Sequence, residues 1–437
     1  MTRGPFRSLL SQPRAQKSAS ADDEPSELHR TASRAGEGTS KPLDVRESGI
    51  VPARSRNAVQ GVMPRALSLR APRPSARLAE GAHRHALSQF GSAIAGGGDM
   101  LLIGSRLQQT RPFATLYRVT SKGVIRERML RGALGHGGPS LATDGVRVAV
   151  GQPGAVVPSA PDGRPSQGAG NGFVSVYRRG AGELELEATL ELKPDDPACA
   201  RFGQVVVIHE DLLVLGQPGS ICVYRHSAVG WLSAGTLQPT LPYEWNPNFG
   251  LSFSAVAGRV LVGNPVEIDG HRAGPGRVFV YRQEGDHMEL EAELLGDGIE
   301  GGRDSEPRLG FGASIEVAGD FVLISAPYEL SPSGSALSRI YVYRVHRGSL
   351  TRVATLDVPS CRSLCLIGER LFVLGDELYV FARRGNAFEP LATYPVNGAS
   401  AAQVTLARCG ALLALGYPDG DDESHTGEVS LHFPDQL

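Results

Sequence analysis

A unit of two β-rich runs recurs along this chain, and it restricts the possible folds more than any other feature. In the clearest copy, FGASIEVAGDFVLISAP from Phe311 to Pro327, Phe-Gly precedes an apolar run, a tight polar turn, a second apolar run and a small residue before Pro. Six further copies, some of them weaker, bring the number of units to seven. These six begin at Phe90, Leu134, Arg201, Asn248, Ser360 and Gly398.

Each unit continues into a third apolar strand that ends in an aromatic residue. Five of the seven third strands carry Tyr followed by Arg, as in RVFVYRQ and RIYVYRV, and a fourth strand such as LELEATLEL closes most units. Unit starts fall roughly 40 to 70 residues apart, a spacing typical of sheets repeated around an axis. The sequence therefore predicts an all-β fold, a seven-bladed β-propeller of four-stranded antiparallel blades, with no helix longer than about two turns after Phe90.

The chain before the repeats has a different composition. Residues 1–60 are rich in Arg, Ser, Ala, Pro and Glu and contain a single aromatic residue, Phe6, and few β-branched residues. Such a segment cannot bury enough apolar surface to offset the entropy lost on ordering. We predict that residues 1–60 form a disordered tail and that residues 61–437 form the propeller.

Charge is divided unevenly between these parts. Residues 1–85 hold 15 Arg and Lys against 8 acids, a net charge of +7, which leaves −9 on the remainder because the whole chain carries −2. Binding of nucleic acid requires a clustered basic surface that neutralises phosphates. The acidic balance of the repeats therefore disfavours nucleic acid as a partner.

The seventh unit ends in EVSLHFPDQL and leaves no room for its own fourth strand. A ring of sheets must join its first and last parts if it is to avoid an open strand edge. Within the polar tract that precedes the repeats, residues 62–72 (VMPRALSLRAP) contain an alternating run, Ala66 to Arg70. We predict that this segment supplies the closing strand of the last blade, so that both ends of the chain build it.

The repeated pattern of Phe-Gly, a small-apolar-Pro triplet and a strand ending in Tyr or Phe resembles the FG-GAP repeat of integrin-α-type N-terminal seven-bladed propellers, in the bacterial type without calcium loops. The resemblance covers Phe90 to Leu437. The first half of the motif matches at Phe90, Phe202, Phe249 and Phe311, each followed by Gly, and the second half matches at GQP, GNP and SAP triplets. An aromatic residue before Gly can fill the gap between wedge-shaped blades while Gly allows close backbone approach. These residues are therefore expected to be architectural.

Sequence motifs for catalysis or metal binding are missing. The turns between the first and second strands lack the spaced oxygen ligands that calcium prefers, and the acidic run from Asp419 is expected to be a solvated loop. The five cysteines, including Cys361 and Cys365, are expected to be buried thiols rather than a metal or redox site. We find no Gly-x-Ser-x-Gly, His-Glu-x-x-His, P-loop or Cys-x-x-Cys motif. The sequence predicts no cofactor and favours a protein that is not an enzyme.

Long connections between the second and third strands, and between blades, fall on one face of the predicted ring, and binding commonly resides on such loops. Tyr243, Trp245 and Tyr328 are the expected aromatic anchors for a protein or glycan, although they could instead pack down as loop plugs. An alternative is a hydrolase-like enzyme in the central channel, with Asp269, Asp297 and Glu329 as its carboxylates. A third hypothesis is a delivered or structural component tethered by its tail.

The cellular location is left open by the sequence. No stretch approaches the roughly 20 apolar residues that cross a bilayer, and the first residues lack the apolar core of a secretory signal. The FG-GAP resemblance implies an extracellular or cell-surface protein. We expect a monomer.

Overall fold

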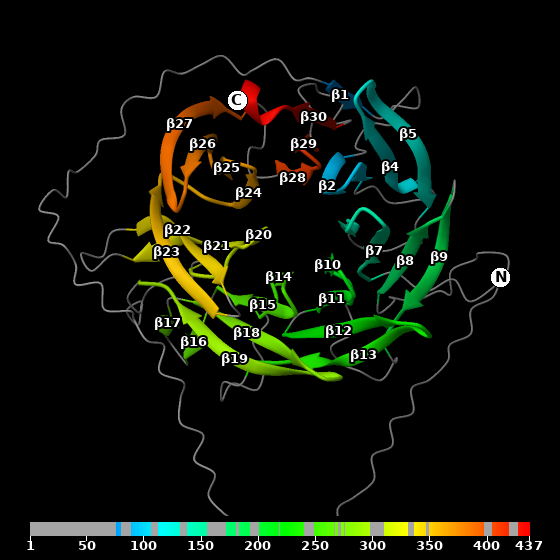
Figure 1. Ribbon diagram of the computed structural model, residues 1–437, viewed down its shortest axis with the longest axis horizontal. Coiled ribbons are helices and arrows are strands. Elements are labelled where there is room, and N and C mark those ends of the chain that lie inside the picture. Colours follow the sequence, from blue (N-terminus) through cyan, green and yellow to red (C-terminus); the bar gives the residue numbers. More distant parts are fainter. Residues whose placement is uncertain are drawn as a thin grey trace, which may run out of the picture. The chain divides into compact units, whose positions relative to one another are not determined.

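The computed structural model describes residues 76–79, 89–105, 112–131, 138–154, 172–180, 183–192, 201–217, 219–239, 249–265, 267–269, 272–274, 276–297, 310–330, 336–346, 349–396, 404–418 and 427–437. Seven four-stranded antiparallel sheets form a ring (Figure 1), so the predicted seven-bladed propeller is confirmed. Near the end of the chain, η3 (Pro434–Gln436) is a short 3-10 helix. None of the described helical segments is long and apolar enough to cross a membrane.

The first three blades follow the chain from the inner to the outer strand. Blade 1 comprises β2 (Phe90–Gly97), β3 (Met100–Ser105), β4 (Pro112–Thr120) and β5 (Gly123–Arg131). Blade 2 comprises β6 (Ser140–Thr143), β7 (Arg147–Gln152), β8 (Phe173–Arg179) and β9 (Leu184–Leu190). Blade 3 comprises β10 (Val205–His209), β11 (Leu212–Gln217), β12 (Ser220–Ser227) and β13 (Gly230–Leu237).

The next three blades keep the same order. Blade 4 comprises β14 (Ser252–Val256), β15 (Arg259–Asn264), β18 (Arg277–Glu284) and β19 (His287–Leu295), with the added hairpin β16 (Glu267–Asp269) and β17 (Arg272–Gly274). Blade 5 comprises β20 (Ile315–Ala318), β21 (Phe321–Leu330), β22 (Ala336–His346) and β23 (Ser349–Val358). Blade 6 comprises β24 (Ser363–Ile367), β25 (Arg370–Leu374), β26 (Glu377–Arg384) and β27 (Ala387–Pro395).

Blade 7 is assembled from both ends of the described chain. Its strands β28 (Thr405–Cys409), β29 (Leu412–Tyr417) and β30 (Glu428–His432) come from the end of the sequence, and its outer strand is β1 (Ala76–Ala79). β1 pairs antiparallel with β30, with Ala76 opposite Leu431 and Ala79 opposite Glu428. The predicted closing segment, residues 62–72, lies outside the described residues. The outer strand in the structure is a different segment, a few residues further along, which starts just after Pro72 and Pro74; a proline has no N–H to donate to a strand ladder.

Phe-Gly pairs form the seams between blades, as the sequence interpretation required. Phe90, Phe202, Phe249 and Phe311 are each at most 2% exposed. The glycine after each phenylalanine has a positive φ, +95° at Gly312, a conformation that favours glycine. A Cβ added to Gly263 of blade 4 would lie 2.2 Å from the carbonyl oxygen of Gly312 in blade 5, so two backbones meet directly at this seam.

A hydroxyl group strengthens several of these seams. The Ser252 hydroxyl of β14 donates a hydrogen bond to the Gly312 carbonyl of the next blade at 2.6 Å. Ser140 donates in the same way to Gly203 at 2.6 Å, and Thr405 donates to Gly91 at 2.7 Å, which links blade 7 to blade 1. A hydroxyl residue on the inner strand thus satisfies a backbone carbonyl that the Phe-Gly turn would otherwise leave unpaired.

The recurrent Tyr-Arg pair at the end of the third strand has two separate roles. The tyrosine ring packs between blades, and Tyr281 and Tyr343 are each 5% exposed. The arginine reaches the turn between the first and second strands, where Arg225 contacts Asp211 at 2.9 Å and Arg344 contacts Asp320 at 2.5 Å. These ion pairs are solvent-exposed, so each contributes little to stability. They mark the face of the ring that carries the tight turns, which we call the tight-turn face.

A β-bulge lies beside this aromatic residue in six blades. In blade 6, Val380 pairs with Ala392 but Phe381 pairs with Pro390, which leaves Leu391 as an extra residue on the outer strand. Equivalent register shifts occur in blades 1 to 5. A bulge increases the local twist of a strand, and in blade 6 it leaves the Leu391 side chain 48% exposed.

Candidate functional site

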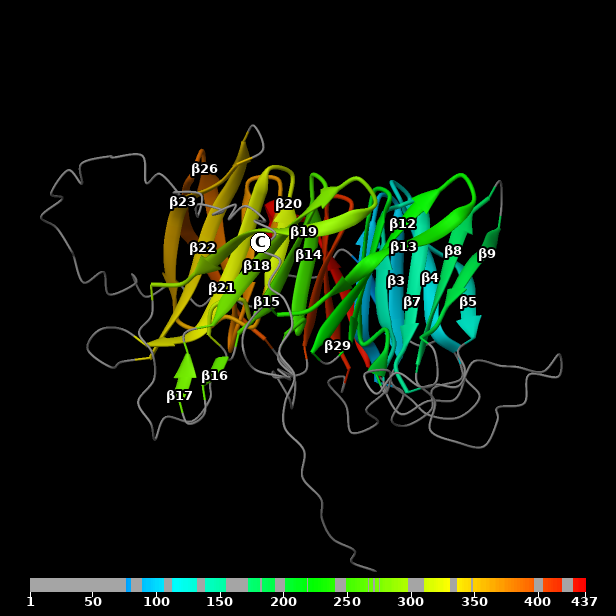
Figure 2. The ribbon, with the colours of Figure 1, turned by 90° about the horizontal axis from the view of Figure 1, so that it is seen from below.

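Two neighbouring blades extend beyond the ring on the face opposite the tight turns, which we call the long-loop face. Blade 4 carries the hairpin β16–β17 between its second and third strands, and Figure 2 shows it projecting from the ring. In blade 5 the strands β21 and β22 are 10 and 11 residues long, whereas the second strands of the other blades have 5 or 6. The described residues therefore form two β-ribbons on the face where binding was predicted.

Three of the predicted site residues lie on these ribbons. Tyr328 is in β21 and its side chain is 50% exposed, at a point where the pairing with β22 shifts register between Ala326 and Glu329. Glu329 follows directly in β21 and pairs with Leu337. Asp269 ends β16, opposite Arg272. The backbone thus places an exposed aromatic residue and two acidic positions on adjacent blades.

The remaining predicted residues do not belong to this group. Tyr243 and Trp245 lie outside the described residues. Asp297 follows the outer strand β19, where its carboxylate accepts a hydrogen bond from Arg352 of β23 at 2.7 Å, and its N–H donates to the Tyr341 hydroxyl at 2.7 Å. Arg352 also lies over the Tyr341 ring, 5.7 Å from its centroid. Asp297 therefore joins the outer strands of blades 4 and 5, away from the inner strands that surround the channel.

The inner strands carry a titratable cluster that sequence motifs did not reveal. Glu316 of β20 accepts a hydrogen bond from the Leu366 N–H of β24 at 3.4 Å. Burial raises the pKa of Glu316 to about 7, against the opposing effects of Arg408 on β28 and of the Leu366 N–H. Burial and the nearby Glu316 raise the pKa of the Cys365 thiol well above its usual range, so this cysteine stays protonated. The signal in the sequence is a lone Glu within an apolar inner strand.

Glu316 should make stability depend on pH. The folded-state pKa is above the ordinary value of 4.5, so between about pH 4.5 and 7 the folded state keeps a proton that the unfolded state loses. The free energy of unfolding should therefore fall as pH rises through this window, by up to about 3 kcal/mol at pH 8. Urea denaturation of Glu316→Gln across pH 4 to 8 should lack this component. The exposed Glu389→Gln variant is the control, and its free energy of unfolding should keep the same pH dependence as that of the native chain. If the free energy of unfolding of Glu316→Gln also varied with pH in parallel with the native chain, the assignment would be contradicted.

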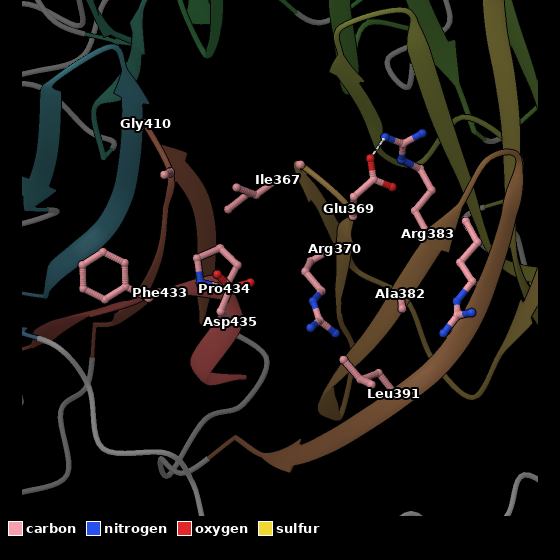
Figure 3. Close-up of a pocket in the computed structure, with 13 residues that line it drawn as sticks. Ile367, Glu369, Arg370, Ala382, Arg383, Leu391, Gly410, Phe433, Pro434 and Asp435 are labelled. Carbon is pink, nitrogen blue, oxygen red and sulfur yellow. Dashed lines mark hydrogen bonds and ion pairs between the residues drawn. The ribbon is translucent and has the colours of Figure 1, made fainter.

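A groove lies between blades 6 and 7 on the tight-turn face, with a volume of about 750 Å³ (Figure 3). Its walls include Ile367, Arg370, Ala382, Leu391, Phe433 and Asp435. The neighbouring outer strand β1 of blade 7 has four residues, whereas those of the other blades have 7 to 10. β1 pairs no further than Leu431, and the chain beyond β30 turns into η3.

Four of the five cysteines lie within the described residues. Cys222, Cys361, Cys365 and Cys409 are buried thiols that form no disulfide, and burial raises the pKa of both Cys361 and Cys409 to about 12. Across the described ranges, no three His, Cys, Asp or Glu side chains gather in a way that could hold a metal ion. Cys199 and the acidic run from Asp419 lie outside those ranges.

These features define the protein as a seven-bladed β-propeller with extended ribbons on one face and a groove at its closure. Comparison with protein-family models and with curated proteins found no match, so the FG-GAP family is not confirmed. Among solved structures, a chain of the mitotic checkpoint complex has 13% sequence identity and a TM-score of 0.50, over 84% of this chain and 98% of that one. The β-propeller domain of Cps50 (Swd1) from Myceliophteria thermophila has 12% identity and a TM-score of 0.51, over 83% and 99%. These likenesses show the fold alone.

Proposed function

We propose that this propeller is a non-catalytic binding module that recognises a protein or glycan through the long-loop face of blades 4 and 5. The observation that carries the proposal is the pair of β-ribbons on adjacent blades, because regular extensions beyond the blades are not needed to close the ring. Binding surfaces are commonly built on such extensions of a rigid scaffold. Propellers also serve widely as interaction platforms.

Tyr328 is the recognition residue that we infer for this surface. A half-exposed tyrosine offers a large apolar face with a polar hydroxyl, a combination favoured at interfaces. Glu329 follows Tyr328 directly in β21, and Asp269 lies on the hairpin of the neighbouring blade 4. The surface would therefore suit a partner with an apolar or sugar-ring face next to a basic or hydroxyl-rich group.

Replacement of Tyr328 by Ala should weaken partner binding by about tenfold or more while leaving the melting temperature unchanged, because the side chain is exposed rather than part of the core. Binding would be measured by glycan array and by affinity capture from the native organism, comparing the native chain with the variant. Leu186→Ala is the matched control, since Leu186 is 59% exposed on the outer strand of blade 2. Equal loss in both variants, or unchanged binding in Tyr328→Ala, would contradict the proposal.

A catalytic role at the channel has weaker support. Asp297 is engaged at the outer wall by Arg352, and catalysis by Glu316 would need a second functional group within reach of the same substrate. The tethered-component hypothesis depends on residues outside the described ranges. We also infer a monomeric protein at the cell surface or outside the cell, as the FG-GAP resemblance implies. Light scattering and fractionation of the native organism would test these two inferences.

A further inference from the structure

The groove between blades 6 and 7 has an unusual distribution of charge. Arg383 forms an ion pair with Glu369 at 2.5 Å (Figure 3), and its guanidinium lies 4.6 Å from the centroid of the Phe321 ring. Arg384 forms an ion pair with Glu389 at 3.2 Å. Arg370, in contrast, has no ion pair or side-chain hydrogen bond with any residue that the structure describes. Its guanidinium extends into the groove, on the side of Leu391 and Asp435 (Figure 3).

Two exposed apolar side chains line the groove, Leu391 close to this guanidinium and Phe433 at the far end, beyond Pro434 and Asp435 (Figure 3). Leu391 is the bulged residue of β27, and Phe433 follows β30 (Figure 3); they are 48% and 49% exposed. Ile367 and Ala382 contribute further apolar surface. An arginine whose guanidinium extends into a partly apolar groove suits a carboxylate, since the fork of the guanidinium matches two carboxylate oxygens.

Charge argues against the chain's own upstream segment as the occupant. That segment leads into β1, whose first residue, Ala76, lies opposite Leu431 near the groove. Residues 61–75 contain Arg65, Arg70 and Arg73 and no acid. Docking them would add cations beside Arg370, which forms no ion pair with a described residue, although Asp435 lines the same groove. A partner that brings a negative charge is favoured instead.

We propose that this groove binds an extended peptide segment of another protein, in which a carboxylate side chain is flanked by apolar side chains. The carboxylate pairs with Arg370, and the apolar side chains cover Leu391 and Phe433. The groove lies on the tight-turn face, so the proposal is independent of the ribbon surface formed by blades 4 and 5.

The test is a selection of random heptapeptides displayed on phage against the immobilised full chain. The expected result is enrichment of peptides with Asp or Glu between apolar residues. For the enriched peptide, fluorescence anisotropy should show binding about tenfold weaker or worse with Arg370→Gln, with Leu391→Ser, or when the peptide's acid is replaced by its amide. Arg282→Gln is the control, because Arg282 is a 51% exposed arginine in blade 4. Thermal melting of each variant distinguishes lost binding from lost folding.

Several outcomes would overturn the proposal. One is a selection that yields no common motif, or a motif whose binding is unchanged by Arg370→Gln and Leu391→Ser. Enrichment of basic peptides resembling residues 62–75 would assign the groove to the chain's own segment. A dimer in light scattering that Leu391→Ser dissociates would assign it to a second copy. Reversal of the charge tests the proposal further, because Arg370→Glu should abolish the enrichment of acidic peptides. Continued enrichment of acidic peptides on this variant would contradict the proposal.

Discussion

Removal of residues 1–80 is expected to lower the melting temperature by about 5 °C or more, whereas removal of residues 1–75 should change it little. The difference between the two truncations is β1, which covers the outer edge of β30 over four paired positions. Leu78 of β1 also packs on the apolar cluster between blades 7 and 1, which includes Leu101, Val429 and Leu431. Without β1 the ring loses this closure, and β30 offers an exposed edge to other chains.

Differential scanning calorimetry and light scattering of the two truncated chains would measure this effect. The longer truncation should also form aggregates through its open strand edge. A point variant in the full chain, Leu78→Asp, should reproduce part of the loss, because it places a charge in the seam without shortening the chain. Identical melting of both truncations would mean that β1 does not close the ring in solution.

Replacement of Gly263 by Ala should destabilise the protein by roughly 3 kcal/mol or more, because the added methyl group cannot be accommodated by side-chain movement alone. The new Cβ would lie 2.2 Å from the Gly312 carbonyl oxygen and 2.3 Å from the Ser252 hydroxyl. Relief of this overlap requires the backbones of blades 4 and 5 to separate, which also breaks the hydrogen bond from Ser252 to Gly312.

Urea denaturation would measure the loss, with Gly285→Asn as the control. Gly285 lies in a turn of the same blade with φ of +60°, a Cβ added there would have nothing within 4 Å, and Asn tolerates this conformation. The seam between blades 5 and 6 shows how a side chain can be accepted. Ser325 occupies the place of Gly263 there, and blade 6 has Cys361 near the position of Phe-Gly. A native-like stability for Gly263→Ala would show that the seams are more adaptable than this close approach implies.

Much of the fold could be predicted because its determinants are local and repeated. Each Phe-Gly turn, apolar strand and Tyr-Arg ending is encoded within a short stretch. Seven copies of the pattern predict the same four-stranded unit. The antiparallel pairing of neighbouring strands then follows from the alternation of apolar and polar residues and from the tight turns between the strands. The location of the closing strand was harder to predict, because β1 is a four-residue segment, ARLA, with little pattern of its own.

The candidate sites were less accessible to sequence reasoning. The long-loop face was predicted from loop length, and Tyr328 is exposed there. The groove was missed because its parts, Arg370, Leu391 and Phe433, are far apart along the chain and match no motif.

The sequence by itself determined the all-β class, the number of blades and the architectural role of the Phe-Gly pairs, because these depend on neighbours along the chain. Only the tertiary structure decided which segment closes the ring, that Asp297 joins two outer strands, and that Glu316 lies beside Cys365 and the Leu366 N–H. These features depend on which residues of different blades meet, and that is set by the curvature and closure of the whole ring. Burial and the balance of charge arise from the same long-range contacts. The raised pKa of Glu316, and the lack of an ion pair for Arg370 among the described residues, therefore became visible only once the blades were assembled.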